Sequence, residues 1–139
     1  QIMSYSLQEQ IDDFYNQINI HWEKKEFEHI SNVLDDAWGV LSLPKQEHHE
    51  SYHICNFHII NYMELKDFDK ALLWAHKIQT CALTRVNDGD REFLKATVLY
   101  ALKEFPSALD LLKIANNKSD GRCFKEVDIK YKQFFDSKK

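Results

Sequence analysis

Apolar residues recur along this chain at the spacing of an α-helix. In the first segment they are Leu7, Ile11, Phe14, Ile18 and Trp22, each three or four residues after the previous one. Residues at this spacing lie on one face of a helix, so residues 6–22 are predicted to be helical. The same pattern predicts six further helices, over residues 27–40, 45–65, 68–83, 90–102, 106–116 and 125–135. We therefore expect an all-α fold of about seven helices.

Polar and turn-forming residues mark the ends of these helices. Ser6 and Glu9 have the spacing of a capping box at the start of the first helix. Pro44 is expected to open the third helix, and residues 87–90 and 117–121 are predicted turns. The side chains expected to face inward from the third and the last helix are Ile54, Phe57, Ile60, Tyr62, Val127, Tyr131 and Phe134.

A three-residue phrase occurs three times, as Lys25-Glu26-Phe27, Lys66-Asp67-Phe68 and Lys103-Glu104-Phe105. Its phenylalanines lie 41 and then 37 residues apart, and apolar or small residues follow each at helical offsets. A period of this length is typical of stacked helical hairpins. We expect three antiparallel hairpins with the seventh helix as a C-terminal cap, all in one domain over residues 1–139. Residues 1–5 are expected to be disordered or partly an added tag, with Met3 as the native start.

The second and third phrases resemble the joint between the two helices of a tetratricopeptide repeat. The matching stretches are residues 65–72 and 102–109, in which Ala71 and Ala108 stand at the tight helix crossing of that family. The first copy departs from the pattern, with Ile30 in place of alanine. The resemblance implies a right-handed tetratricopeptide-like array. Because the spacings exceed the family's period of about 34 residues, we expect longer hairpins and an irregular superhelix.

Residues 93–124 resemble a group of small bacterial tetratricopeptide-like proteins that are encoded beside polymorphic toxins. The resemblance is carried by the ending Ser119-Asp120-Gly121-Arg122-Cys123-Phe124, which matches Ser-x-Gly-Arg-x-Phe before a last helix. Members of that group act as immunity proteins. The resemblance implies a protein that binds a cognate toxin domain and occludes its active or substrate site. No binding residue is carried over, because such proteins vary most where they bind.

Composition and charge narrow the classes of partner. A net charge of −4 excludes the basic surface that nucleic acid binding needs, and it suits a basic protein partner such as a nuclease domain. Three cysteines without a CxxC motif indicate a reducing, cytoplasmic environment. The chain lacks an apolar run long enough to cross a membrane. It also lacks a phosphate-binding glycine loop and a nucleophile elbow. We therefore expect no catalytic residue and no cofactor, and we expect that the protein is not an enzyme.

One motif suggests metal chemistry. His49-Glu50-Ser51-Tyr52-His53 is a literal HExxH, whose two histidines share a helix face and whose glutamate can activate a zinc-bound water. Polar residues precede the motif, and no third histidine follows at the spacing of zinc proteases. We therefore expect no metal, with His49 and His53 as the candidates if one binds. Whether the cluster from His48 to His58 holds a metal is left open, and a small zinc hydrolase is the third functional hypothesis.

The first helix of each hairpin is expected to line the concave face of the array. Its residues combine aromatic rings with carboxylates and amides, which suits a protein interface. The predicted binding residues are Asp12, Tyr15, Asn19, Trp22, Glu23, His53, Asn56, Met63, Phe93 and Tyr100. Core packing is the alternative for the large aromatic residues. A general peptide-binding adaptor is the second functional hypothesis, although this set lacks the Lys and Arg residues of a carboxylate clamp.

Overall fold

The chain is helical throughout the residues that the computed structural model describes, which are 6–83 and 88–138. These residues contain seven α-helices and no strand, as the sequence predicts. The α-helices and the short 3₁₀ helices η1 and η3 follow the order α1 (Leu7–Glu23), α2 (Phe27–Gly39), η1 (Lys45–Glu47), α3 (His49–Glu64), α4 (Phe68–Ile78), α5 (Asp90–Ala101), α6 (Phe105–Ser119), η3 (Arg122–Phe124) and α7 (Ile129–Ser137). The predictions for residues 1–5 and for Asn87 fall outside the described residues.

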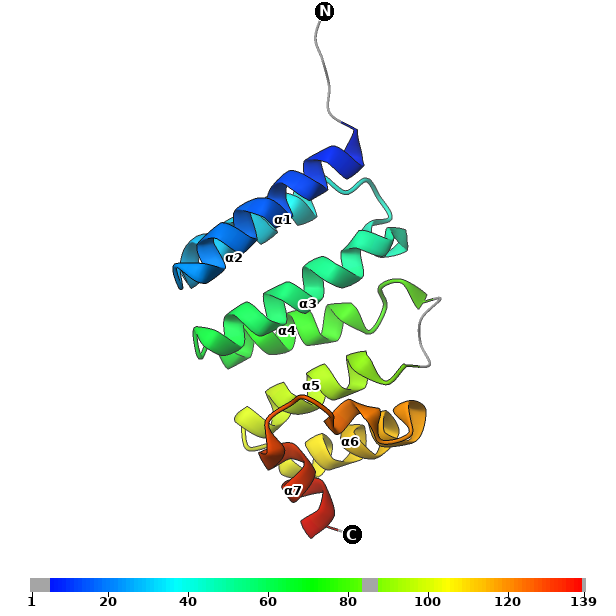
Figure 1. Cartoon of the computed structure of the whole chain (residues 1–139). Coiled ribbons are helices and arrows are strands. Elements are labelled where there is room, and N and C mark those ends of the chain that lie inside the picture. The colour runs from blue at the N-terminus through cyan, green and yellow to red at the C-terminus, as the bar shows by residue number, and fades with distance from the viewer. Residues whose placement is uncertain (1–5, 84–87, 139) are drawn as a thin grey trace, which may run out of the picture.

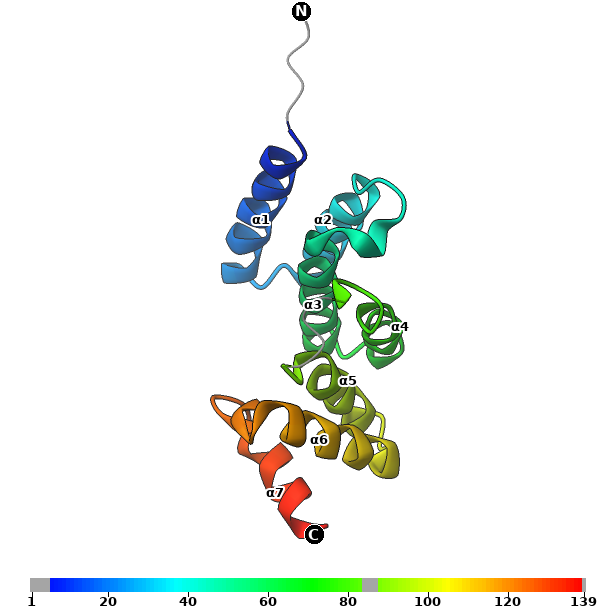
Figure 2. The same ribbon diagram turned by 90° about the vertical axis from the view of Figure 1, so that its right-hand side faces the viewer.

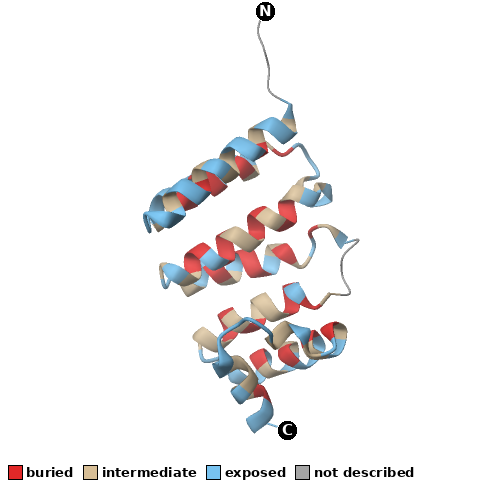
Figure 3. Ribbon diagram, in the orientation of Figure 1, coloured by how far each residue is buried: buried red, intermediate tan, exposed pale blue. Residues whose placement is uncertain are grey.

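Six of the helices form three antiparallel hairpins that stack one below the other (Figure 1). The hairpins are α1/α2, α3/α4 and α5/α6, and they are joined by the packing of α2 on α3 and of α4 on α5. Seen from the side, the second helix of each hairpin turns progressively around the stack, so that α6 lies on the other side from α2 (Figure 2). The buried residues follow the facing sides of these helices (Figure 3).

The three Lys-acid-Phe phrases form the same joint between the helices of each hairpin. Lys25, Lys66 and Lys103 adopt the left-handed conformation, with φ of 58°, 58° and 65°. Each following residue donates its backbone N–H to the carbonyl five residues earlier: Glu26 to His21 (3.0 Å), Asp67 to Tyr62 (2.9 Å) and Glu104 to Leu99 (2.9 Å). This is the Schellman motif, which satisfies the last carbonyls of one helix. The repeated phrase therefore encodes a repeated turn.

The residue three positions after each phenylalanine lies in the core of its hairpin. Ala71 and Ala108 are fully buried, and Ile30 is 1% exposed at the equivalent position. Alanine at this position leaves room for close packing of the two helices, whereas Ile30 fills the same position with a larger side chain.

Helix α7 packs across the third hairpin. Phe135 is buried in a cluster with Ala96 of α5 and Leu112 of α6. The helix begins at Ile129, not at Lys125 as predicted, because Asp128 caps it by accepting the N–H of Lys130 (3.0 Å). Val127 is consequently 37% exposed ahead of the helix, so its predicted inward position was wrong.

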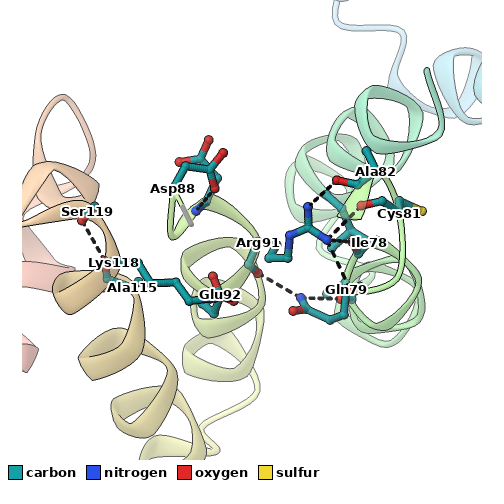
Figure 4. A network of polar contacts seen from close by, with 12 residues as sticks. Ile78, Gln79, Cys81, Ala82, Asp88, Arg91, Glu92, Ala115, Lys118 and Ser119 are labelled. Carbon is teal, nitrogen blue, oxygen red and sulfur yellow. Dashed lines mark hydrogen bonds and ion pairs between the residues drawn. The ribbon is translucent and has the colours of Figure 1, made fainter. Parts of the chain in front are cut away.

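Three other helix boundaries differ from the prediction. The third helix is interrupted at His48, whose extended backbone separates η1 from α3. Helix α6 continues three residues past Asn116 to Ser119, and Asp120 ends it in the left-handed conformation. Helix α4 ends at Ile78, five residues early, because Arg91 binds the carbonyls that follow (Figure 4). One burial prediction also differs from the structure, because Ile60 of α3 was expected to face inward and is 37% exposed.

Arg91 is a charged side chain enclosed in the core, at 2% exposure. Its Nη1 donates to the carbonyl oxygens of Ile78 (3.1 Å), Gln79 (3.2 Å) and Cys81 (2.9 Å), and Nη2 donates to that of Ala82 (3.2 Å). Figure 4 shows the guanidinium reaching from α5 into the end of α4. One side chain thereby satisfies the carbonyls at the end of α4 and fixes the third hairpin against the second.

Candidate protein-binding surface

An apolar groove opens between α1 and α3, and we call it the α1–α3 groove. Its cavity volume is about 200 Å³, and its lining residues are Ile18, Asn19, Trp22, Ile30, Phe57 and Ile60. Trp22 and Ile60 stand on opposite helices and are 39% and 37% exposed. Large apolar side chains at a concave site are the usual anchors of a protein interface.

Aromatic contacts fix the walls of this groove. Trp22 lies in the last turn of α1 and packs edge-on against Phe27, with ring centroids 5.3 Å apart across the first joint. Phe57 packs in the same way against Tyr15, at 5.5 Å. The groove is therefore held open by side chains that are themselves packed, and it exists before any partner arrives.

Glu50, the acid of the HExxH motif, is engaged by a neighbouring helix. The hydroxyl of Tyr15 donates to Glu50 Oε2 at 2.8 Å, and His49 Nε2 lies 3.1 Å from Glu50 Oε1. Burial raises the pKa of Tyr15 well above its usual range, and the hydrogen bond to the Glu50 carboxylate raises it further. Glu50 thus accepts a hydrogen bond that ties α1 to α3.

The two histidines of the motif stand together, with ring centroids 5.1 Å apart and planes at 78°. No group of three or more His, Cys, Asp or Glu side chains that could hold a metal ion occurs among the described residues 6–83 and 88–138. A zinc hydrolase needs three protein ligands and a free base. The motif offers two candidate ligands and a glutamate held by Tyr15.

His58 belongs to the core on the other side of α3. Its ring stacks on Trp74 at 4.0 Å, and Nε2 lies 3.1 Å from Asp35 Oδ1, outside hydrogen-bond geometry. Burial, together with a smaller effect of nearby Lys77, lowers the pKa of His58 to about 3. Attraction by Asp35 opposes this shift, but its carboxylate is largely in solvent while the imidazole is fully enclosed. His58 is therefore a neutral core residue.

Two cysteines meet in the core. Cys55 Sγ and Cys81 Sγ are 3.8 Å apart, and both residues are fully buried. Hydrogen bonding from Cys55 lowers the pKa of the Cys81 thiol to about 6, against the effect of burial. Cys123 is partly buried.

A second cavity, the α3–α5 pocket, lies beside the C-terminal segment. Its volume is about 380 Å³, and it is lined by Tyr52, His53, Asn56, Asp90, Phe93, Leu94, Arg122, Cys123, Lys125 and Val127. The segment from Arg122 to Val127 passes in front of α5 in Figure 1. It brings two cations to a face on which the sequence predicted none.

The structure divides the ten predicted binding residues among different environments. Asn19 and Trp22 line the α1–α3 groove, while His53, Asn56 and Phe93 line the α3–α5 pocket. Asp12 and Glu23 are exposed on α1, and Tyr15 pairs with Glu50.

The remaining two predicted residues, Met63 and Tyr100, pack within the chain. Met63 packs against the core cluster formed mainly by α3 and α4. Tyr100 meets Tyr131 of α7 edge-on at 5.4 Å, and Tyr131 also contacts Phe93 at 5.7 Å. For Phe93 and Tyr100 the structure thus shows the intramolecular packing that was the alternative to binding.

Several lining residues were absent from the ten predicted binding residues. Ile18 and Phe57 were assigned to helix packing, and in the groove they do both. Arg122 and Lys125 had no signal, because helical periodicity says nothing about where a loop folds back.

Charge is strongly segregated between the two ends of the array. The sequences of α1, α2 and α3 contain no Lys or Arg and nine carboxylates: Glu9, Asp12, Asp13, Glu23, Glu28, Asp35, Asp36, Glu50 and Glu64. Helices α4 to α7 carry eight cations, at Lys70, Lys77, Arg91, Lys95, Lys113, Lys118, Lys130 and Lys132, and five carboxylates, at Asp69, Asp90, Glu92, Asp110 and Asp136. The two helices on either side of the α1–α3 groove are thus acidic, and the nearest cations in sequence are Lys24 and Lys25, directly after α1.

Comparison with protein-family models, curated proteins and solved structures finds no match to this chain. Within the described residues, no helix has the length and apolar character needed to cross a membrane.

Proposed function

We propose that this protein binds a basic toxin domain in the cytoplasm and neutralises it by covering its active or substrate site, as an immunity protein does. The observation that carries the proposal is the coincidence of an apolar groove with a half-molecule whose three helices hold nine carboxylates and no Lys or Arg. An apolar anchor site within a field of one sign is the arrangement of interfaces that associate quickly with a partner of opposite charge.

The ending at residues 119–124 supports the choice of a toxin as the partner, through its resemblance to immunity proteins. The proposal gives the chain no catalytic role and no cofactor. Its inhibitory action follows from occlusion, for which tight binding is sufficient. Because a nuclease domain presents cations to its nucleic acid substrate, a carboxylate-rich surface can occupy the same site.

Co-expression tests this proposal. The product of the adjacent gene is expressed in cells with and without this chain, and cell survival and complex formation are measured. We expect rescue and a stable complex, with an association rate that falls as salt is raised. Absence of both binding and rescue would end the proposal.

A peptide-binding adaptor is the second candidate, and the α3–α5 pocket favours it. Arg122 and Lys125 place two cations beside the aromatic side chains of Tyr52 and Phe93. This arrangement suits a peptide that ends in a carboxylate next to an apolar residue. Loss of peptide binding in an Arg122→Gln, Lys125→Gln variant, with unchanged rescue from the toxin, would assign this function to the pocket.

A further inference from the structure

The α1–α3 groove is bordered by hydrogen-bond acceptors on its solvent side. Asp12, Asn16, Asn19 and Glu23 follow one another at intervals of four, three and four residues along α1, and all four are exposed. This spacing places them in one row on the helix. Asn19 itself lines the groove, so the row runs along its edge. A chain lying in the groove would meet apolar side chains below and carboxylates and amides beside it.

Exposed apolar residues elsewhere in the chain have a different setting. Leu73 is 52% exposed on α4, between Lys70 and Lys77, and Ile114 is exposed on α6 beside Lys113. Each matches Ile60 in size and exceeds its exposure, but each lies on a helix that carries two lysines, whereas α1 and α3 contain no Lys or Arg. An apolar side chain flanked by Lys or Arg therefore fits the α1–α3 groove better than it fits these two sites.

We propose that the α1–α3 groove receives one large apolar side chain from a Lys- and Arg-rich segment of a partner protein. The inference rests on the proposed protein-binding function and names what that function recognises. The side chain enters between Trp22 and Ile60, where burial against the two supplies the affinity. The cations beside it pair with Asp12 and Glu23 on the rim, which sets the orientation of the segment and the rate of association.

A random twelve-residue peptide library displayed on phage tests the inference without any toxin. Selection is carried out on the immobilised full-length chain, with prior depletion on the Ile60→Glu variant. The expected consensus is one Trp, Phe, Leu or Met flanked by Lys or Arg. The selected peptide is then synthesised and its affinity is measured by titration calorimetry against wild-type protein and matched variants.

The matched variants separate the groove from general effects of the substitutions. Ile60→Glu should weaken binding by at least about tenfold, whereas Leu73→Glu, the same change on another exposed apolar residue, should leave it within about twofold. A second pair alters charge alone. Asp12→Lys with Glu23→Lys should weaken binding similarly, and the control Asp69→Lys with Asp110→Lys, which changes net charge equally, should not.

The results of these experiments distinguish the possible occupants of the α1–α3 groove. Failure to enrich any peptide, an acidic or anchorless consensus, or binding that Ile60→Glu and the rim pair leave unchanged would overturn the inference. Concentration-dependent dimers in sedimentation velocity that Ile60→Glu abolishes would also overturn it, by assigning the groove to a second copy. Rescue from the toxin has its own readout. If the Ile60→Glu variant still rescues cells, the proposed function stands, but the groove is not where the toxin binds.

Discussion

Tyr15 on α1 and Glu50 on α3 share a hydrogen bond of 2.8 Å that joins two helices belonging to different hairpins. Hydrogen bonds with a charged partner are among the stronger ones in proteins, and both side chains are partly enclosed here. The bond also engages the glutamate of the HExxH motif.

Removing the Tyr15 hydroxyl should therefore destabilise the fold. We expect Tyr15→Phe to lower the free energy of unfolding by about 1 to 2 kcal/mol, measured by urea denaturation. A double-mutant cycle with Glu50→Gln should show coupling between the two positions, because the second change removes the charged acceptor. Strictly additive effects would contradict a direct bond.

Arg91 offers the largest stability effect. Arg91→Met removes the donor for the carbonyls of Ile78, Gln79, Cys81 and Ala82 while keeping an apolar stem. The carbonyl of Ile78 keeps the N–H of Cys81 (3.2 Å), but those of Gln79, Cys81 and Ala82 lose the guanidinium, which should cost about 3 to 5 kcal/mol in chemical denaturation. The control is Lys113→Met on an exposed part of α6, which should change stability by less than about 0.5 kcal/mol. Equal stability of the two variants would show that the guanidinium is dispensable.

The repeated joint predicts a stabilising substitution. Lys103 has φ of 65°, a conformation that costs an L-residue free energy and glycine almost none. Lys103→Gly should raise the free energy of unfolding by about 0.5 to 1 kcal/mol, and Lys66→Gly should do the same. Lys113→Gly, in the interior of α6, should instead destabilise by about 1 kcal/mol. Destabilisation at all three positions would refute the assigned conformation of the joint.

The neutral His58 predicts a pH dependence of stability. Its folded-state pKa, about 3, lies below the ordinary value of about 6.5, so the unfolded chain takes up the proton first. Stability from this residue is fully present above pH 6.5 and is lost as the pH falls toward 3. Between pH 7 and pH 4 the loss should reach about 3 kcal/mol.

Groups around His58 modify this dependence, so a variant is needed to isolate it. Lys77 of α4 acts in the same direction as burial. Asp35 of α2 has the opposite effect on stability. Burial and the charge of Asp36 raise its folded-state pKa, so protonation of Asp35 as the pH falls favours the folded state. His58→Phe keeps an aromatic ring against Trp74 and removes the titration. Its urea midpoint should vary less between pH 7 and pH 4 than that of the wild type, and an equal slope would place the effect elsewhere.

The sequence predicts the helices of this protein well because their packing faces have a regular period. It also predicts the joints, since Lys-acid-Phe marks the same turn each time. Arg91 could not be recognised, because a charged residue after an Asn-Asp-Gly-Asp turn has the pattern of a solvated one. The early end of α4 follows from that residue, so it was missed for the same reason.

The candidate site was predicted only in part. Trp22 and Asn19 were identified from the register of α1, but the groove depends on the offset between α1 and α3, which is set by the packing of α2 between hairpins. Phe57 was assigned to the helix interior because an apolar residue on an apolar stripe is usually buried. Ile60 was assigned to the same stripe and also, by its register, to the concave face. The uneven distribution of charge is visible in the sequence, but the sequence does not show that α1, α2 and α3 lie together around one groove.

The central claim is that a basic toxin domain binds at the α1–α3 groove and is neutralised there. The most direct test is inhibition of the purified product of the adjacent gene by wild-type protein, by Ile60→Glu and by Leu73→Glu, each first shown to be folded by circular dichroism. The account predicts inhibition by wild type and Leu73→Glu, and inhibition weakened at least about tenfold by Ile60→Glu. Equal inhibition by all three proteins, or inhibition by none of them, would contradict it.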